Sequence, residues 1–481
     1  MQSEELLALV NKIQLQKCES QTIEVKAAQT GCPTRLFDTL SAFSNQDDGG
    51  IIVFGLDENA DFKVVGVYDP QDVQKKVTEQ CKQMEPIIRP LFTVCTIGEN
   101  VVVSAEIPSV DADQRPVFYK GVGRIKGSYI RVGESDERMS EYEIYSYDAF
   151  RKRIRDDMRK IEGVKLSFFD GRRLEQYLSA IKRDRHNIAN ASEDEILELM
   201  GVISDGIPTL AGLMVFSPYP QASLPQLCIT AVVVPGLQIG DLGEDGERFL
   251  ANQRITGPIP EMLEAAVDFV RRNGRVKTII DNDGRRIDKP EFPVKAVREA
   301  ILNALVHRDY SIHTETVPVR IIMFNDRMEI INSGGLYGNL SIDSLGKVHP
   351  DTRNPTLANI LELLSVTENR YSGIPTIRKE FKEAGLPDPV FVSSRGEFIV
   401  VFKNDLVSSQ TQDNRGDMNS ALLQFCKKPR SRKEIITFTG FSQYYTMSKL
   451  IQPLLDAGKL QMTIPEKPKS RYQRFVTVGK C

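Results

Sequence analysis

Apolar residues recur along the chain with periods that predict a mixture of helices and strands. Leu6, Val10 and Ile13 share one face of a helix expected at residues 4–17, whereas residues 51–56 form the unbroken apolar run of a buried strand. The other elements expected before residue 150 are a helix at 36–44 and strands at 22–27, 92–97, 101–107 and 129–132. This order predicts an α+β unit.

The alternation continues through residues 160–407. Ser192 and Glu195 have the spacing of a capping box ahead of a helix at 196–200. Val297, Ile301 and Leu305 give residues 294–306 one apolar face. Further elements are expected as a helix at 258–270, core strands at 210–216 and 227–234, and a hairpin of strands at 317–324 and 328–331.

A polar stretch that begins at Ser408 is the predicted linker to a C-terminal unit. That unit is expected to contain helices at 422–425, 432–438 and 446–457, then strands at 460–463 and 474–478. The predicted parts are residues 1–150, 151–290, 291–407, the linker 408–417 and residues 418–481. We therefore expect an α+β multi-domain protein.

Composition supports a folded protein and excludes several classes. The 481 residues are 41% hydrophobic and 26% charged, as in globular domains rather than disordered or fibrous chains. No run approaches the ~20 apolar residues of a membrane span, and the acidic start is unlike a signal peptide. Seven cysteines, never spaced C-x-x-C, argue against a disulfide framework or structural zinc. We expect a cytoplasmic protein without a membrane partner.

Charge is unevenly distributed along the chain. The net formal charge is −3, yet residues 426–481 hold twelve Lys and Arg against three Asp and Glu, a net charge of +9. A basic end on an acidic body suggests a polyanion partner, although a solvated basic surface would give the same count.

Candidate chemistry in the first unit begins with Glu19, Glu24 and Lys26. Glu24 and Lys26 are two apart on a predicted strand and share a face, and Asp57 ends the next strand. Carboxylates suit Mg²⁺ or Mn²⁺, and a lysine can stabilise the charge of a phosphate. The alternative is a surface ion pair beside a solvated Glu19.

The same region resembles a Schlafen AlbA-type domain over about the first 145 residues. The resemblance is carried by residues 19–26, 42–45, 49–50 and 54–57. It implies a nucleic-acid domain. In nuclease members it implies Glu19, Glu24, Lys26 and Asp57 as catalytic residues, with the two glutamates and Asp57 (or Glu58) as metal ligands. Other members are nucleic-acid-binding regulators.

A second group of candidate functional residues lies on the helix expected at 294–306 and directly after it. Glu299 and Asn303 are four residues apart on one face, and His307 follows one step later. A carboxylate can orient water and an amide oxygen can bind Mg²⁺, although an ordinary polar helix face has the same pattern.

Residues 298–310 resemble the N-box of GHKL-type ATPases, and residues 331–336, 353–355 and 372–375 are similar to its later motifs. The resemblance implies a Bergerat-type α/β sandwich that binds ATP, with Asn303 also contacting the metal. The implied cofactor-binding residues are Glu299, Asn303, His307, Asn332, Gly334, Gly335, Arg353, Asn354, Ser372 and Gly373. Residues 332–335 replace the acidic D-x-G-x-G box and Tyr371 replaces a glycine, which predicts weak or absent ATP hydrolysis.

Residues 418–481 have the length and element order of a winged helix. Basic residues at a helix start and in the wing are placed to contact phosphates. The candidate nucleic-acid contacts are Arg430, Arg432, Lys433, Lys467, Lys469, Arg471 and Arg474. A protein-docking module is the alternative.

Together these features predict a nucleotide-gated protein that acts on nucleic acid, RNA or DNA. As an enzyme it would be a metal-dependent (ribo)nuclease of the Schlafen type, with antiphage defence as one setting. The alternative is an ATP-binding, DNA-binding transcriptional regulator without nuclease activity. A scaffold in a larger defence assembly is a third possibility. We expect Mg²⁺ or Mn²⁺ and ATP as cofactors, and a homo-oligomer.

Overall fold

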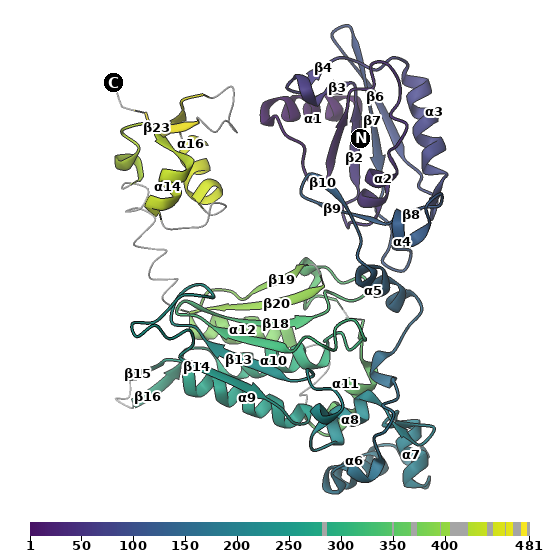
Figure 1. The fold of residues 1–481 in the computed structure, drawn as a ribbon, viewed down its shortest axis with the longest axis vertical. Coiled ribbons are helices and arrows are strands. Elements are labelled where there is room, and N and C mark those ends of the chain that lie inside the picture. Colours follow the sequence, from purple (N-terminus) through teal and green to yellow (C-terminus); the bar gives the residue numbers. More distant parts are fainter. Residues whose placement is uncertain are drawn as a thin grey trace.

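The computed structural model describes residues 1–280, 286–348, 351–366, 373–394, 396–404, 422–439, 446–456, 458–464 and 473–478. Figure 1 shows an N-terminal unit joined through helix α5 (Glu141–Arg151) to a larger α/β body, followed by a small C-terminal unit. The predicted α+β, multi-domain fold class is confirmed. None of the described helices combines the length and the apolar character needed to cross a bilayer.

The N-terminal unit is built on a four-stranded sheet of order β1-β2-β7-β6, in which only the β1–β2 pair is parallel. Its strands are β1 (Ile23–Lys26), β2 (Gly50–Phe54), β6 (Leu91–Ile97) and β7 (Asn100–Ile107). Successive β2 residues face opposite sides. Ile52 and Phe54 join a core with α2 (Phe37–Ser44) and α3 (Pro70–Cys81), whereas Val53 packs with α1 (Ser3–Gln16). The expected helices and strands before residue 135 are therefore confirmed.

Short elements complete this unit. They are β3 (Leu56–Asp57), η1 (Glu58–Ala60), β4 (Lys63–Val64), β5 (Met84–Glu85), β8 (Phe118–Tyr119), α4 (Gly123–Gly127), β9 (Tyr129–Val132) and β10 (Ser135–Arg138). Helix α5 then begins at a capping box, in which Ser140 Oγ accepts the N–H of Glu143 and the Glu143 carboxylate accepts the N–H of Ser140. This cap fixes where the chain turns toward the body.

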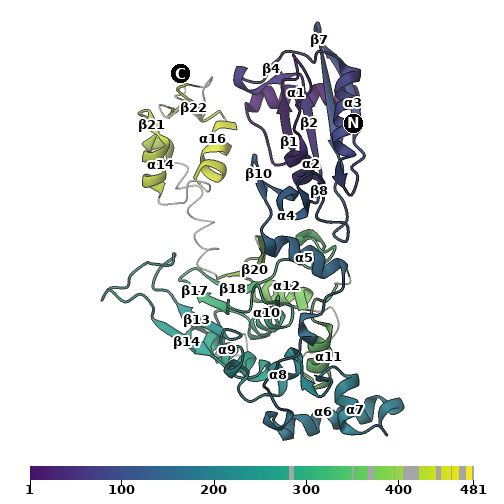
Figure 2. The same ribbon diagram turned by 45° about the vertical axis from the view of Figure 1, so that its right-hand side comes forward.

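The body contains a six-stranded sheet of order β14-β13-β17-β18-β20-β19, with β13 and β17 parallel. The strands are β13 (Ile229–Val233), β14 (Ala251–Ile255), β17 (Val319–Met323), β18 (Arg327–Ser333), β19 (Val390–Ser394) and β20 (Glu397–Lys403). Helices α9 (Ile259–Asn273), α10 (Val294–Val306) and α12 (Gly373–Ala384) lie along one side of it (Figure 2). Ile321 and Met323 point into the core shared with these helices, whereas Ile322 joins a small cluster on the other face.

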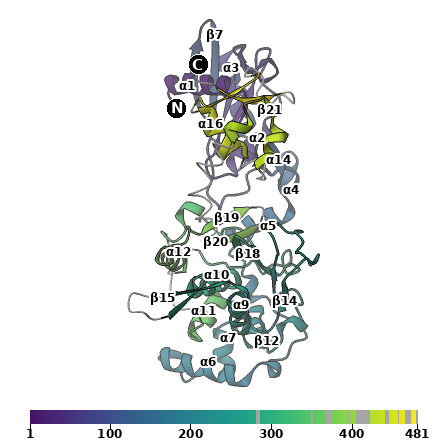
Figure 3. The same cartoon turned by 90° about the vertical axis from the view of Figure 1, so that its left-hand side faces the viewer.

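The core beneath this sheet extends from Ile161 to Phe402, so residues 161–227 pack with the elements of the six-stranded sheet. The remaining described elements of the body are η2 (Asp156–Met158), η3 (Leu166–Phe168), α6 (Gly171–Asp184), η4 (His186–Ile188), α7 (Glu193–Leu199), β11 (Ile203–Ser204), β12 (Ile207–Pro208), α8 (Leu210–Phe216), η5 (Pro220–Ala222), β15 (Val276–Ile280), β16 (Arg286–Pro290), η6 (Ile342–Ser344) and α11 (Pro355–Leu363). Figure 3 shows α6 at the end of the body farthest from the N-terminal unit.

One predicted element of the body is wrong. The apolar run at residues 210–216 is helix α8, not a strand. Thr209 caps it by accepting the N–H of Gly212 at 3.1 Å, and all seven helical residues are buried. Because the run is apolar on every side, periodicity could not separate a buried helix from a buried strand.

The C-terminal unit has a three-stranded sheet of order β21-β23-β22 packed against helices. Its labelled elements are β21 (Arg430–Ser431), α14 (Arg432–Thr439), η7 (Thr446–Ile451), α16 (Gln452–Asp456), β22 (Leu460–Met462) and β23 (Arg474–Thr477). The single helix expected at 446–457 is instead a π-helical turn followed by α16, at a point where Pro453 supplies no N–H. The predicted linker 408–417 lies outside the described residues.

Candidate functional site

A cavity of about 310 Å³ lies between α10, the end of β18 and the start of α12. From α10, Asn303 Nδ2 approaches Glu299 Oε1 at 3.4 Å. Gly373 begins α12 directly opposite this pair, because a Cβ at this glycine would lie 2.5 Å from Glu299 Oε1 and 2.8 Å from Asn303 Nδ2. The first turn of α12 thus faces a carboxylate and an amide.

The other side of the cavity is organised by Arg353. Its Nη1 pairs with Asp309 Oδ2 at 2.6 Å, and its Nη2 donates to the Gly335 carbonyl at 3.3 Å. Gly334 has φ +97°, and a Cβ there would lie 2.7 Å from Arg353 Nη1. Only glycine therefore permits this approach of the β18 end to the guanidinium. The guanidinium also lies over the Tyr337 ring, 5.0 Å from its centroid.

Two titratable groups of this region have shifted pKa values. His307 opens onto the cavity, yet the protein around it and the charge of Arg353 lower its pKa to about 4, so the imidazole is neutral at pH 7. Burial acts to raise the pKa of Asp309, but Arg353 and hydrogen bonds from Ser311 and Tyr142 hold it below its ordinary value. Asp309 is therefore ionised beside Arg353.

Eight of the ten predicted cofactor-binding residues line this cavity, namely Glu299, Asn303, His307, Asn332, Gly334, Gly335, Arg353 and Gly373. Asn354 does not line it. Its amide donates to the carbonyls of Val306 and Arg308 at 2.8 and 2.7 Å, which closes the end of α10. Ser372 lies outside the described residues. Tyr337 and Asp351 also line the cavity, and neither stood in a motif that predicted it.

The acidic residues of the N-terminal unit meet at a buried arginine. Arg131 Nη2 lies 2.8 Å from Glu24 Oε2 and 3.6 Å from Glu19 Oε2, and Nη1 lies 2.8 Å from Asp136 Oδ1. Glu24 also pairs with Lys26, as expected for two residues on one strand face. The Arg131 side chain is 1% exposed, so it neutralises these carboxylates from inside the domain.

Glu19 has an unusual pKa in this cluster. Burial raises the pKa of Glu19 to about 7, against a hydrogen bond from the Val25 N–H at 2.7 Å that lowers it, and the charge of Glu24 raises it further. Burial therefore outweighs the contact with Arg131 at 3.6 Å, and Glu19 holds its proton more tightly than a solvated glutamate does.

The predicted metal ligands do not form a shared donor set. The structure brings Glu19 and Glu24 together, but Asp57 Oδ1 instead accepts the N–H of Asn59 at 3.0 Å and caps η1. Over the described ranges no three His, Cys, Asp or Glu side chains are grouped to hold a metal ion. Arg131 pairs with both glutamates and Lys26 pairs with Glu24, so a metal ion here would compete with two cations without a third carboxylate, and this arrangement does not fit a metal.

The predicted nucleic-acid contacts are only partly described. Arg430 pairs with Glu434 at 3.3 Å and covers the Phe425 ring at 4.3 Å, and Arg474 is exposed on β23. Arg432 begins α14. The side chain of Lys433, and residues Lys467, Lys469 and Arg471, lie outside the described part of the chain.

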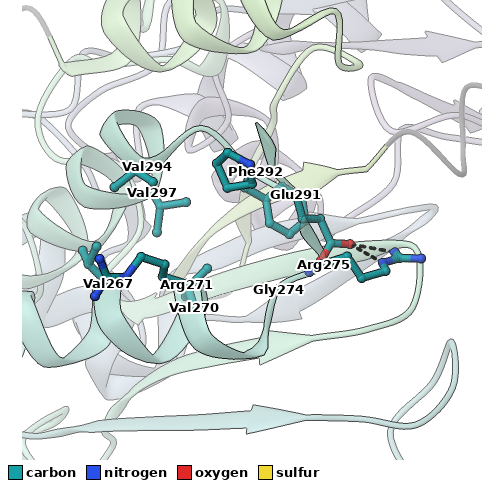
Figure 4. A pocket seen from close by; sticks show the side chains of 10 residues that line it. Val267, Val270, Arg271, Gly274, Arg275, Glu291, Phe292, Val294 and Val297 are labelled. Carbon is teal, nitrogen blue, oxygen red and sulfur yellow. Dashed lines mark hydrogen bonds and ion pairs between the residues drawn. The ribbon is translucent and has the colours of Figure 1, made fainter. Parts of the chain in front are cut away.

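A second, much smaller cavity of about 20 Å³ lies between α9 and the start of α10. Figure 4 shows Arg275 and Glu291 paired at one side of it, with an N–O distance of 2.6 Å, and valines at the other. This volume is close to that of one water molecule, so the cavity is no candidate for a cofactor.

Two family models match the chain. Residues 19–140 match the family "Schlafen, AlbA_2", and residues 317–402 match the family described as "Putative ATP-dependent DNA helicase recG C-terminal". The second match begins beyond Glu299, Asn303 and His307 but contains Asn332, Gly334, Gly335 and Arg353. The protein therefore carries a Schlafen AlbA_2 domain followed by an ATPase-type domain of the RecG C-terminal class.

Two solved structures are similar to this chain. The DIP2311 protein of Corynebacterium diphtheriae is 16% identical with a TM-score of 0.40, and the match covers 95% of this chain and 93% of that chain. The N-terminal domain of a RecG-related protein of Nitrosomonas europaea is 26% identical with a TM-score of 0.23, covering 28% of this chain and 92% of that chain. Both TM-scores are low, so neither likeness bears on function. A search of curated proteins gave no match.

Proposed function

We propose that the protein binds ATP in the cavity between α10, β18 and α12 and uses nucleotide occupancy to control a nucleic-acid-binding activity. The observation that carries the proposal is the convergence of eight residues, from four separated motifs, on one cavity. Its volume of about 310 Å³ lies within the usual size range of small-molecule sites.

The lining residues fit a nucleotide accompanied by a divalent cation. The Asn303 amide oxygen and the Glu299 carboxylate are hard ligands of the kind that Mg²⁺ prefers. The first turn of α12 lies at the cavity, where a helix N-terminus favours phosphate, and the missing side chain of Gly373 leaves room beside Glu299. When bound, the cation would neutralise part of the phosphate charge. Because residues 332–335 lack the usual acidic box, we expect ATP hydrolysis to be weak or absent.

For the nucleic-acid activity we favour binding and regulation over cleavage. Arg131 already pairs with Glu24 at 2.8 Å and approaches Glu19 at 3.6 Å, and Asp57 caps a separate turn, so cleavage would require the acidic cluster to rearrange. The C-terminal unit, with the basic residues of 426–481, is the proposed winged-helix contact to duplex phosphates. Nuclease activity and a role in antiphage defence remain predictions.

Calorimetric titration of the full chain with ATP in the presence of Mg²⁺ tests the proposal. Wild type should bind, and Asn303→Ala should weaken binding at least tenfold. The matched control is Asn252→Ala, which changes an exposed asparagine on edge strand β14. Equal affinity for wild type and Asn303→Ala would refute the assignment of the site.

A further inference from the structure

Helix α5, which follows the Schlafen-type domain, contacts the wall of the nucleotide cavity. The Tyr142 hydroxyl donates to Asp309 Oδ2 at 2.8 Å, and the same oxygen pairs with Arg353 Nη1 at 2.6 Å. Arg353 in turn lines the cavity. One carboxylate oxygen therefore joins α5 to a cationic group that faces the nucleotide site.

The C-terminal end of α5 makes a second link. Phe150 packs edge-to-face against Tyr337, with ring centroids 5.2 Å apart and an interplanar angle of 87°. Tyr337 lines the cavity beneath the Arg353 guanidinium. The packing is close, because a Cβ at Gly338 would lie 2.9 Å from Phe150 Cε2. The C-terminal end of α5 thus touches Tyr337 of the cavity wall directly, whereas the N-terminal end is joined to Arg353 of that wall through Asp309.

A third contact comes from the N-terminal unit itself. The Ala112 N–H donates to Asn339 Oδ1 at 3.4 Å, on the segment 336–340 that supplies Leu336, Tyr337 and Leu340 to the cavity. Figures 1 and 2 agree in placing α5 at the junction between this unit and the body. The cavity wall is therefore also the surface on which the N-terminal unit rests.

The Tyr142 hydroxyl is held in place rather than free to rotate away. A Cβ at Gly396 would lie 2.4 Å from Tyr142 Cε1, so the turn before β20 confines the ring. Asp309 is further fixed by the Ser311 N–H at 2.8 Å. With Tyr142, Ser311 and Arg353 as partners, the buried Asp309 carboxylate is held in one orientation. The Arg353 guanidinium that pairs with it is therefore held in one orientation as well.

We infer that Tyr142 is a positioning residue for nucleotide binding: it holds Asp309 so that Arg353 points into the cavity, and it thereby couples nucleotide occupancy to α5 and the domain before it. The inference rests on the proposed ATP site. Because coupling between two sites is reciprocal, a nucleotide that engages Arg353 must also stabilise the contact of Tyr142.

The test compares Tyr142→Phe with Tyr145→Phe in the full chain. Tyr145 lies on the same helix, but its hydroxyl bonds to Asp156 at 2.9 and 3.0 Å instead of Asp309. Calorimetry with ATP and Mg²⁺ should show affinity reduced about three- to tenfold in Tyr142→Phe, the size of one ordinary net hydrogen bond, and unchanged in Tyr145→Phe.

The wild-type arm of a second readout does not depend on whether the variant folds. Hydrogen exchange of wild type should slow across residues 141–151 when ATP saturates the cavity, and this slowing should be lost in Tyr142→Phe at saturating ATP. If wild type binds ATP but exchange of α5 does not change and Tyr142→Phe keeps wild-type affinity, the inference is wrong and the ATP site stands. If wild type binds no ATP, both are wrong.

Discussion

Replacing Arg131 by methionine tests how the acidic cluster of the N-terminal unit is held. Methionine keeps much of the volume beside Phe43, whose ring centroid lies 5.2 Å from the guanidinium, but it removes the charge. Glu24 and Asp136 each lie 2.8 Å from Arg131, so buried Glu24 would keep only Lys26 and half-buried Asp136 would lose its cation. Breaking a buried ion pair from one side typically costs about 3–5 kcal/mol, which is the loss of domain stability we expect.

The assay must report on this domain alone, because a multi-domain chain does not unfold in one step. The chain has no tryptophan, so hydrogen exchange of peptides from residues 1–140 is a suitable measure of the domain's opening free energy. The matched control is Arg35→Met, which removes an exposed arginine that pairs with Asp38 at 3.1 Å in the same domain. We expect no measurable change in this control.

Two results would refute the account of the cluster. The first is equal stability of Arg131→Met and Arg35→Met. The second is full restoration of Arg131→Met by Mn²⁺ alone, which would show that the carboxylates form a metal site.

Three further predictions concern the acidic cluster, the cavity and the C-terminal unit. Because burial raises the pKa of Glu19 from 4.5 to about 7, the folded state keeps a proton that the unfolded state releases, so stability should fall as the pH rises between these values. Denaturation of wild type should show a loss of about 1–2 kcal/mol between pH 5 and 8, allowing for solvent screening, and Glu19→Gln should lack it. Gly334→Ala should abolish ATP binding in calorimetry by displacing Arg353, whereas Gly98→Ala, which also has positive φ but no neighbour within 4 Å, should leave binding intact. Removal of residues beyond 408 should weaken duplex binding and reduce its log–log salt slope by about 0.9 per lost phosphate contact, measured by filter binding across salt concentrations; an unchanged slope would make this unit a docking module.

The spacing of apolar residues predicted most of the secondary structure, because most helices and strands bury one apolar face and expose the other. The α1 stripe of Leu6, Val10 and Ile13 and the buried run of β2 are examples. Helix α8 escaped prediction since it is apolar on every side. The π-helical turn before Pro453 was not predicted, because the spacing of apolar residues does not distinguish the hydrogen bonds of a π-helix from those of an α-helix.

Spacing along one element also predicted neighbours within the candidate sites, such as Glu299 with Asn303 and Glu24 with Lys26. It could not predict partners from other elements. Arg131 contacts both Glu19 and Glu24, yet it lies on β9, more than 100 residues further along the chain. Tyr142 likewise meets Asp309 only because α5 folds against the body. Such contacts depend on tertiary packing, for which a single sequence carries no periodic signal.

Photo-labelling with 8-azido-ATP most directly tests the claim that the cavity is a nucleotide site. After irradiation of the full chain, mass spectrometry should find the label within the segments that line the cavity, 299–307, 332–340, 345–348, 351–362, 373–377 and 398–400. Excess ATP should abolish it, and Asn303→Ala should reduce it. Label confined to other segments, or label that ATP does not compete away, would contradict the account.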